Sequence, residues 1–303
     1  MRKDLIILFI FFIPIHLFTQ ETSWEEGDIA IVQWEKTSFF DSIRDSIIEG
    51  ISVKIDEYHL KGKIEKIFEI LRKVSKKDYR LVIMIGAQII TPILQYLPEN
   101  HIIIIGSSIE LDALHKKFPN ITGVYSFVSP EVQYRTIIQL KNDVKNIGVI
   151  YNSLHSRIQI KMLESAITDT AISLTKNAVS NPREIATALH FMKDIDILWV
   201  PTDPIYRDKK AIKSIIDFSL ENKIPVFSPS IEFVQRGALA SQLPKGISLE
   251  ILSILASLEK GEDITDVLPR FPGERLALNI NTAELLGIEI SPDLRLTSIE
   301  VYE

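Results

Sequence analysis

The sequence predicts an α/β protein built of two doubly wound lobes, in each of which helices cover both faces of a parallel sheet. Short apolar runs that end in glycine or polar residues alternate with longer amphipathic stretches along most of the 303 residues. Strands that alternate with helices in this way form parallel sheets. The alternation occurs twice, before and after a stretch from Phe118 to Tyr151, which we interpret as the bridge between two similar lobes.

The first half of the chain shows strand and helix patterns in regular order. Residues 29–33 are an apolar run of the kind that is buried on both faces of a sheet. After a polar loop, Phe40, Ile43 and Ile47 share one face of a predicted helix, which Gly50 ends. Further strands are predicted at 51–55, 81–85, 101–105 and 118–125, and further helices at 64–74, 88–96 and 109–117.

The second half repeats this order after the bridge. Ser129, Pro130 and Glu131 are typical of a helix start, with a capping serine, a proline in the first turn and an early acid. Strands are predicted at 147–151, 171–174, 195–200, 224–227, 238–240 and 276–280. Helices are predicted at 130–140, 158–168, 181–192, 209–221, 249–258 and 282–286.

The first twenty residues differ in kind from the rest. Arg2 and Lys3 precede an apolar segment at 5–13, which is the pattern of a secretory signal. The segment is shorter than a typical membrane span. No pair of small residues marks a cleavage site, so removal of residues 1–20 and their retention as an anchor both stay open. We expect export, to the periplasm or to the outer face of the cytoplasmic membrane.

Composition narrows the classes of partner and chemistry. The net charge is −6 and no basic cluster occurs, so we expect no nucleic-acid partner. The absence of cysteine excludes disulfides, thiolate metal sites and a cysteine nucleophile. The histidines are not spaced as metal ligands, and no phosphate-binding loop, HExxH motif or nucleophile elbow is present. We therefore predict a non-enzyme without cofactor or metal, and we expect a monomer.

A ligand of such sheets binds outside the carboxyl ends of the strands. The residues at those ends in the predicted lobes are mostly hydrogen-bonding or aromatic. They are Gln33, Trp34, Gly86, Ala87, Gln88, Ser107, Ser108 and Tyr125 in the first lobe, and Asn152, Ser153, Asp203 and Ser228 in the second.

These residue types suit a small polar or zwitterionic ligand. Glycine lets a ligand approach the backbone, and the next helix offers free N–H groups to an anion. Trp34 or Tyr125 would supply a stacking face. Asp203 follows a buried strand and precedes a proline, so it can pair with a ligand ammonium or cap the following helix. Tight turns select the same glycines and serines, which leaves a purely structural role open.

Several segments together resemble the ABC-transporter substrate-binding proteins of the tryptophan/tyrosine-binding type. The first are Asn120-Ile121-Thr122-Gly123-Val124, Pro130, Gln133 and Ile147-Gly148-Val149-Ile150-Tyr151-Asn152. Those that follow in order are Val200-Pro201-Thr202-Asp203, Lys223-Ile224-Pro225-Val226-Phe227, residues 234–240 and residues 279–288; Gln33 and residues 40–45 also fit. The order and spacing of these segments carry the resemblance, which spans nearly the whole mature chain.

This resemblance implies the type 1 periplasmic-binding-protein fold, with a hinge that the chain crosses three times, near Phe127, Leu243 and Arg275. The expected N-terminal lobe is then 28–127 plus 244–275, and the C-terminal lobe is 128–243 plus 276–303. The implied function is capture of a small ligand, with an aromatic amino acid as the best guess, for an ABC permease in the membrane. Binding would close the lobes over the ligand.

Other functions stay open on the sequence alone. A sensory or interaction protein could keep the binding fold without a transporter, and a retained N-terminal anchor would favour it. An enzyme on a two-lobe scaffold is not excluded by fold, although the motifs named above are missing. A structural domain whose cleft holds only water is the remaining alternative. A thermal-shift screen against amino acids, sugars and nucleosides would separate these functions.

Overall fold

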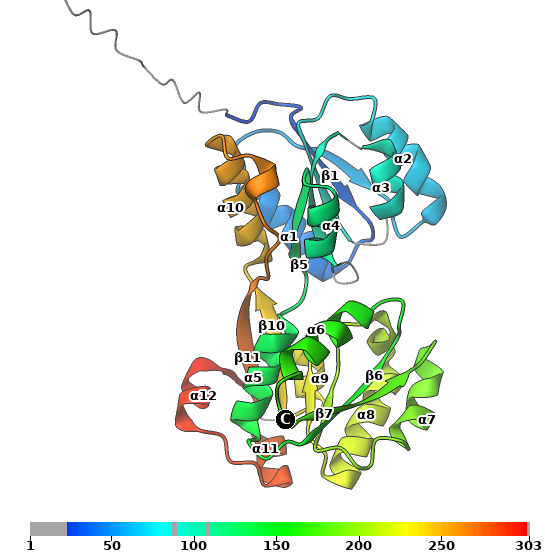
Figure 1. Ribbon diagram of the computed structural model, residues 1–303, viewed down its shortest axis with the longest axis vertical. Helices are drawn as coiled ribbons and strands as arrows, with labels where there is room; N and C mark the ends of the chain where they lie inside the picture. The colour runs from blue at the N-terminus through cyan, green and yellow to red at the C-terminus, as the bar shows by residue number, and fades with distance from the viewer. Residues whose placement is uncertain (1–22, 87–89, 98, 107–109, 302–303) are drawn as a thin grey trace, which may run out of the picture.

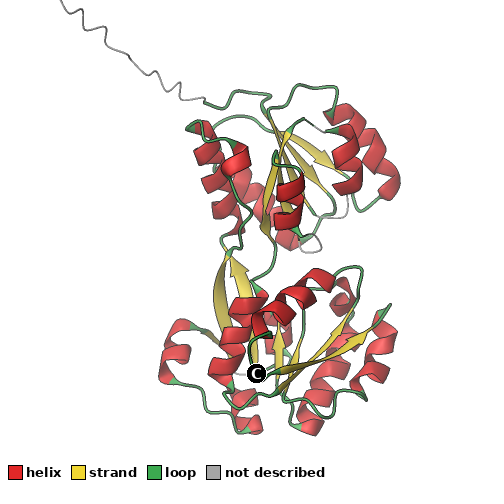
Figure 2. Cartoon of the chain, in the orientation of Figure 1, coloured by secondary structure: helices red, strands yellow, loops and turns green. Residues whose placement is uncertain are grey.

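The chain folds into two α/β lobes, as Figure 1 shows. The computed structural model describes residues 23–86, 90–97, 99–106 and 110–301. In each lobe the strands lie in the interior and helices surround them (Figure 2). The predicted fold class, two doubly wound lobes, is therefore confirmed.

The first lobe is built on a five-stranded parallel sheet with the order β2-β1-β3-β4-β5. Its strands are β1 (Ile29–Gln33), β2 (Asp56–His59), β3 (Leu81–Ile85), β4 (His101–Gly106) and β5 (Ile121–Tyr125). One face packs against α2 (Ile67–Val74), which the short helix η1 (Ile64–Lys66) precedes, α3 (Ile90–Tyr96) and α4 (Leu111–Lys117). The other packs against α1 (Ser38–Glu49) and α10 (Ile247–Glu259), which η5 (Ile264–Asp266) follows.

The second lobe has a seven-stranded sheet with the order β12-β11-β10-β9-β8-β6-β7, parallel except for the pair β10–β11. Its strands are β6 (Asn146–Tyr151), β7 (Ser173–Ala178), β8 (Ile197–Trp199), β9 (Val226–Ser228), β10 (Ala240–Lys245), β11 (Gly273–Asn279) and β12 (Ile299–Val301). Two apolar clusters cover the faces of this sheet.

One cluster of the second lobe involves α7 (Ile185–Leu189), which η3 (Pro182–Glu184) precedes, η4 (Pro204–Arg207) with α8 (Lys209–Asn222), and α9 (Ile231–Gln235). The other involves α5 (Pro130–Leu140), α6 (Arg157–Ile167), α11 (Ile280–Leu286) and α12 (Pro292–Thr297). The helices therefore lie on both faces of this sheet too.

The chain passes between the lobes at three places, after β5, after β10 and before β11. The last passage follows Arg270, whose backbone bonds to Gly123 and Tyr125 of the first lobe. At this hinge the ring of Tyr125 stacks on Phe271, with centroids 4.3 Å apart, and Phe127 lies edge-on to Tyr125. The domain limits expected from the sequence stay a proposal.

The predicted strand at 51–55 is wrong, because the strand that pairs with β1 there is β2, at Asp56–His59. An edge strand has one neighbour, and the side chains of β2 are mostly half-exposed. The sequence of β2 is therefore polar and lacks the apolar run by which strands were predicted. Ile51, Val53 and Ile55, whose alternation suggested a strand, lie in the loop between α1 and β2. Three further elements, α9, α12 and β12, were not predicted from the sequence. Residues 1–20 lie outside the described part of the chain.

Candidate functional site

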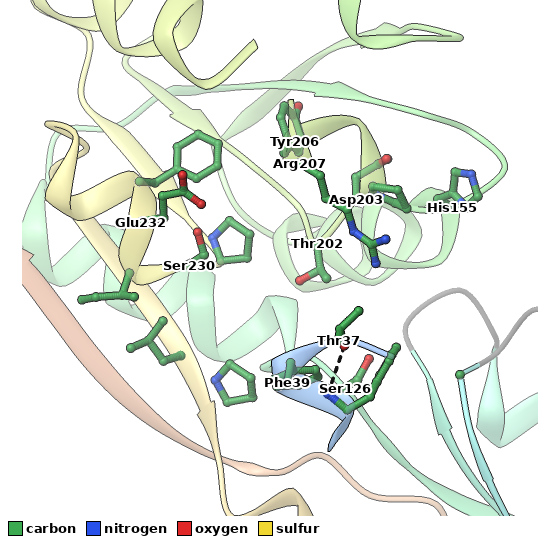
Figure 3. Close-up of a pocket in the computed structure, with 18 of the residues that line it drawn as sticks. Thr37, Phe39, Ser126, His155, Thr202, Asp203, Tyr206, Arg207, Ser230 and Glu232 are labelled. Atoms are coloured by element: carbon green, nitrogen blue, oxygen red, sulfur yellow. Dashed lines mark hydrogen bonds between the residues drawn. The ribbon is translucent and has the colours of Figure 1, made fainter. Parts of the chain in front are cut away.

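A cavity of about 520 Å³ lies between the two lobes, at the carboxyl ends of their central strands. Gly86 follows β3, Gly106 ends β4 and Ser126 follows β5, whereas Thr202 and Pro229 follow β8 and β9 of the second lobe. The remaining lining residues are Glu35, Thr37, Phe39, Phe40, His155, Asp203, Pro204, Tyr206, Arg207, Ser230, Ile231, Glu232, Phe233, Leu243 and Pro244. Figure 3 shows how side chains from both lobes converge on this space.

The first lobe presents the start of α1 to the cavity. Thr37 is the N-cap, and its Oγ1 accepts the backbone N–H of Phe40 at 3.1 Å (dashed line in Figure 3). This cap sets the start of α1 at Ser38 and so places Phe39 and Phe40 in its first turn. Phe39 is 40% exposed and lines the cavity, so it offers an apolar face to a ligand. Gly86 has φ +103°, and a Cβ there would lie 2.6 Å from Cβ of Trp34.

The second lobe presents Asp203, which lines the cavity and is 7% exposed. The backbone N–H of Asn152 donates to its Oδ2 at 2.9 Å, the hydroxyl of Ser156 donates to the same oxygen, and the N–H of Ile205 donates to Oδ1 at 3.1 Å. The last bond makes Asp203 the N-cap of η4. A carboxylate has about four acceptor sites, so Oδ1 keeps capacity for a donor on a ligand.

Tyr206 lines the cavity and is anchored by contacts within the second lobe. Its hydroxyl donates to the backbone oxygen of Ile150, and its ring meets Phe233 edge-on at 5.9 Å. Burial raises the pKa of Tyr206 well above its usual value, and the charge of Asp203 raises it further. The phenol is therefore neutral, and with Phe233 it adds aromatic surface to the cavity.

The charged side chains of the cavity are mostly acidic. Arg207 is the one lysine or arginine among the described lining residues, against Glu35, Asp203 and Glu232. Arg207 Nη2 lies 2.8 Å from Oε1 of Glu35, and Glu232 pairs with Arg236 of its own helix end at 3.0 Å. The lining therefore combines aromatic rings with an excess of carboxylates, which suits a ligand that carries an ammonium on an apolar body.

Of the strand-end residues predicted as ligand-binding, Gly86 and Asp203 line the cavity. Ala87, Gln88, Ser107 and Ser108 lie outside the described residues. The others, Gln33, Trp34, Tyr125, Asn152, Ser153 and Ser228, are not among the lining residues. All but Ser153 are buried, and Ser153 is exposed at the surface of the second lobe.

The structure corrects the predicted stacking face. Tyr125 is 1% exposed, its ring packs at the hinge, and its hydroxyl bonds to Leu111 and Asp112. Trp34 is also buried, in the cluster on one face of the first sheet. Both side chains complete the core of the first lobe. The aromatic lining comes instead from Phe39, Phe40, Tyr206 and Phe233.

Three buried residues support the site from behind. Gln33 Nε2 donates to the backbone oxygen of Glu35 at 2.9 Å and to Oδ1 of Asp41 at 2.7 Å. Asn152 contributes its backbone N–H to Asp203, and its side chain donates to the backbone oxygen of Ser180. Ser228 donates to backbone oxygens of its own lobe.

Most of the residues that line the cavity were not predicted from the sequence. Phe39, Arg207 and Glu232 lie in the first turns after strand-end loops, a few residues beyond the strand ends themselves. A wider window after each strand would have included them. Leu243 and Pro244 lie on β10, where it runs between the lobes. No pattern in the sequence indicates that these two residues line a cavity.

Within the part of the chain that the structure describes, no cluster of three or more histidine or acidic side chains is arranged to hold a metal ion. No helix in those same ranges has the length and apolar character needed to cross a membrane. The described side chains in the cavity form hydrogen bonds and apolar contacts, so the arrangement can bind and orient a small molecule.

Comparison with known proteins points to one family. A sequence model of the family described as ABC transporter substrate binding protein matches residues 33–301. The tyrosine-binding protein of Clostridioides difficile (strain R20291) is 30% identical over 131 residues, which are 42% of this chain and 37% of that protein. The chain thus matches little more than a third of the length of this curated relative.

Solved structures share the fold. The ABC domain from Streptococcus pneumonia in complex with L-Trp superposes with a TM-score of 0.70 at 21% identity, covering 91% of this chain and 100% of that one. A ligand-free, open substrate-binding protein with adhesive properties from Clostridium difficile gives a TM-score of 0.71 at 20% identity, covering 90% and 98%. At these identities the likeness shows the two-lobe fold alone.

Proposed function

Because the chain belongs to the family of ABC transporter substrate-binding proteins, we propose that it captures an aromatic amino acid between its lobes for an ABC importer. Its architecture is that of the type 1 periplasmic-binding-protein fold. The family consists of solute-binding proteins, not enzymes. Its members are typically exported, which agrees with the secretory pattern at residues 1–20. The permease partner and the ligand are the proposed parts.

The observation that carries the proposal is the cavity between the lobes, where aromatic rings face a buried carboxylate. Its volume of about 520 Å³ is in the range of small-molecule sites. Phe39, Phe40 and Phe233 supply apolar surface for a ring. Oδ1 of Asp203 can accept from an ammonium, in a partly buried place where a charged hydrogen bond is strong. The named ligands of relatives, L-Trp and tyrosine, have these two features.

Capture follows from the arrangement of the lobes. The lining residues come from both sheets, so a ligand makes its full set of contacts only when the lobes approach one another. The connections after β5, after β10 and before β11 allow such a rotation. The closed form, with the ligand held between the lobes, is what a permease would recognise.

Calorimetry on the secreted protein tests this proposal with L-Trp, L-Tyr and L-Phe, and with a sugar as a probe without an ammonium. We expect one of the amino acids to bind. Indole-3-propionate, which lacks the ammonium of L-Trp, should bind about ten- to a hundredfold more weakly if Asp203 receives that group. This comparison changes the ligand and leaves the bonds of Asp203 intact.

A matched pair of variants tests the apolar face. Phe39→Ala removes an exposed ring from the cavity, and we expect about tenfold weaker binding from the lost apolar burial. Phe68→Ala removes a similarly exposed ring on α2, 46% exposed and away from the cavity, and should leave affinity unchanged. If no aromatic amino acid binds, or if the two variants behave alike, the proposed ligand site is wrong.

A sensory or interaction role remains the second candidate. One observation favours it: a structure of the same fold comes from a substrate-binding protein with adhesive properties. In that role the protein would present its surface to a partner without delivering a ligand to a permease. Binding of amino acids together with failure to restore uptake by a strain that lacks this chain would support this role.

A further inference from the structure

An ion pair crosses the cavity from one lobe to the other. Arg207 lies at the end of η4 in the second lobe, and Glu35 follows β1 in the first. Their closest atoms, Nη2 and Oε1, are 2.8 Å apart, and Nη1 lies 3.4 Å from Oε2, so both oxygens face the guanidinium. Among the ion pairs of the described residues, this is the one that joins the two lobes. In Figure 3 the side chain of Arg207 extends from its helix toward the loop of Thr37.

Each partner is carried by a segment that the fold holds in place. On the first lobe, the loop of Glu35 is fixed by the backbone bond from Trp34 to Ile85 and by Gln33 Nε2, which donates to the backbone oxygen of Glu35 at 2.9 Å. On the second lobe, Asp203 caps η4. The neighbour of Arg207, Tyr206, is buried and tied to Ile150. Because both backbones are anchored, the ion pair reports the separation of the lobes.

The contact on the hinge side of the molecule has a different character. Met162 of α6 and Phe271 pack against the apolar cluster of the first lobe, which includes Tyr125 and Phe127. Apolar contacts of this kind are nondirectional, and the screening of charges by salt does not weaken them. The ion pair is directional and partly exposed, with side-chain exposures of 60% for Arg207 and 24% for Glu35. Salt therefore weakens the connection at the cavity and spares the one at the hinge.

We propose that Glu35 and Arg207 form a latch, which favours the closed arrangement of the lobes before any ligand arrives and so regulates access to the cavity. Its effect on capture rests on the proposed function, whereas the latch itself is a property of the ligand-free chain. If only the closed arrangement binds fully, apparent affinity falls in proportion to the closed fraction. Partly exposed ion pairs contribute little individually, so the latch biases an equilibrium and does not lock it.

Single-molecule fluorescence energy transfer between dyes on the two lobes tests the latch without a ligand. The chain has no cysteine, so Arg72→Cys on α2 and Thr187→Cys on α7 would be unique labelling sites, and both positions are exposed. These helices lie on the side of the molecule away from the hinge strands β10 and β11 (Figure 1), where opening separates the lobes most. Each measurement gives the ratio of open to closed molecules.

We expect Glu35→Gln and Arg207→Gln each to raise the ratio of open to closed molecules about two- to fivefold. The exchange of charges, Glu35→Arg with Arg207→Glu, should restore most of the original ratio. At about 1 M salt, where the screening length is about 3 Å, the wild-type ratio should approach that of the single variants. Asp217→Asn is the matched control, because it breaks an exposed ion pair with Lys213 inside the second lobe, and it should change nothing.

Two results would overturn the latch. One is an unchanged ratio in both single variants, and the other is a charge exchange that opens the lobes as much as the single variants do. Failure of every aromatic amino acid to bind would refute the proposed function and leave this measurement valid, because no ligand is present in it. Conversely, binding of L-Trp with an unchanged ratio in all variants would keep the function and reject the latch.

Discussion

Tyr125 shows how a polar residue at the end of a strand can have a structural role and make no contact with a ligand site. Its hydroxyl accepts the backbone N–H of Leu111 at 3.0 Å and donates to Oδ2 of Asp112 at 2.7 Å. Its ring stacks on Phe271, so the residue joins β5, α4 and the last passage between the lobes. A tyrosine at the end of a strand could bind a ligand only if its hydroxyl and ring lacked such partners within the protein.

Tyr125→Phe should lower the free energy of unfolding by about 1–2 kcal/mol, because a buried N–H loses its acceptor. The loss should depend on pH. Burial, and then the bond to Asp112, raise the pKa of Tyr125 above its usual value, whereas the unfolded phenol ionises near pH 10. The stabilisation is therefore complete below about pH 10 and is lost as pH rises toward the pKa of the folded state.

Urea denaturation of both proteins at about pH 8 and pH 10.5 measures this effect. Over this interval the wild type loses the part of its free energy of unfolding that depends on a protonated Tyr125, whereas the variant has no phenol at this position to lose it from. The difference in the free energy of unfolding between the two proteins should therefore narrow at the higher pH. A difference of the same size at both values would contradict the assignment of this titration to Tyr125.

At the scale of elements, apolar periodicity located the central strands of the first sheet well and its edge strand β2 poorly, whereas β10 of the second sheet overlaps its predicted range, 238–240, at Ala240 alone. The limits of β1 and β3 are those predicted, because strands with neighbours on both sides are buried along their whole length and therefore mostly apolar. The edge strand β2 is polar and lay outside the prediction. The resemblance to a family, not periodicity, led to the hinge, since nothing local shows that α10 returns to the first lobe.

The site was predictable in part for the same reason. The rule for strand ends predicted Gly86 and Asp203, which line the cavity because their positions follow from the sheets alone; that they bind a ligand stays a prediction. It could not separate residues that face the cavity from those that turn inward, such as Trp34 and Asn152, because both follow a strand directly. The latch partners Glu35 and Arg207 are 172 residues apart, and their contact depends on how the lobes meet.

Within β5, Gly123 is the position where the sheet tolerates no side chain. It pairs with Ile104 of β4, and an added Cβ would meet the backbone of Ile104. Gly123→Ala should therefore cost at least about 3 kcal/mol or abolish folding, since the strands would have to separate. Gly273→Ala on β11 is the matched control, because its Cβ would lie 3.4 Å from the nearest atom, and it should cost less than about 1 kcal/mol. Chemical denaturation of the two variants compares them, and equal losses would contradict the packing described for β5.

At the scale of the whole molecule, the two lobes are separate in space and interleaved in sequence. The first lobe takes α10 from the segment between β10 and β11, both of which belong to the second sheet (Figure 1). An arrangement of this kind prevents either lobe from being cut out as one continuous piece. It also means that a movement of α10 is transmitted directly to β10, which carries Leu243 and Pro244 of the cavity lining.

The interleaving predicts that residues 23–127 alone do not form a stable lobe. Five aliphatic side chains of α10 cover one face of the first sheet: Ile247, Ile251, Ile254, Leu255 and Leu258. At roughly 2 kcal/mol for each buried side chain, their loss amounts to about 10 kcal/mol, which is comparable with the whole stability of a typical domain. The exposed face should bind the dye ANS, and urea unfolding of the fragment should lack a cooperative transition.

Coexpression of residues 246–272 with this fragment should restore a cooperative transition, because the second piece brings α10 back to the apolar face that it covers. The matched control is the same second piece with Ile251→Asp and Ile254→Asp, which places charges on the buried side of the helix and should fail to restore it. Cooperative unfolding of residues 23–127 without α10 would show that the first lobe is autonomous. In that case the five buried side chains of α10 would be dispensable for the fold of the sheet that they cover, and the role of α10 would be to couple the first lobe to the hinge.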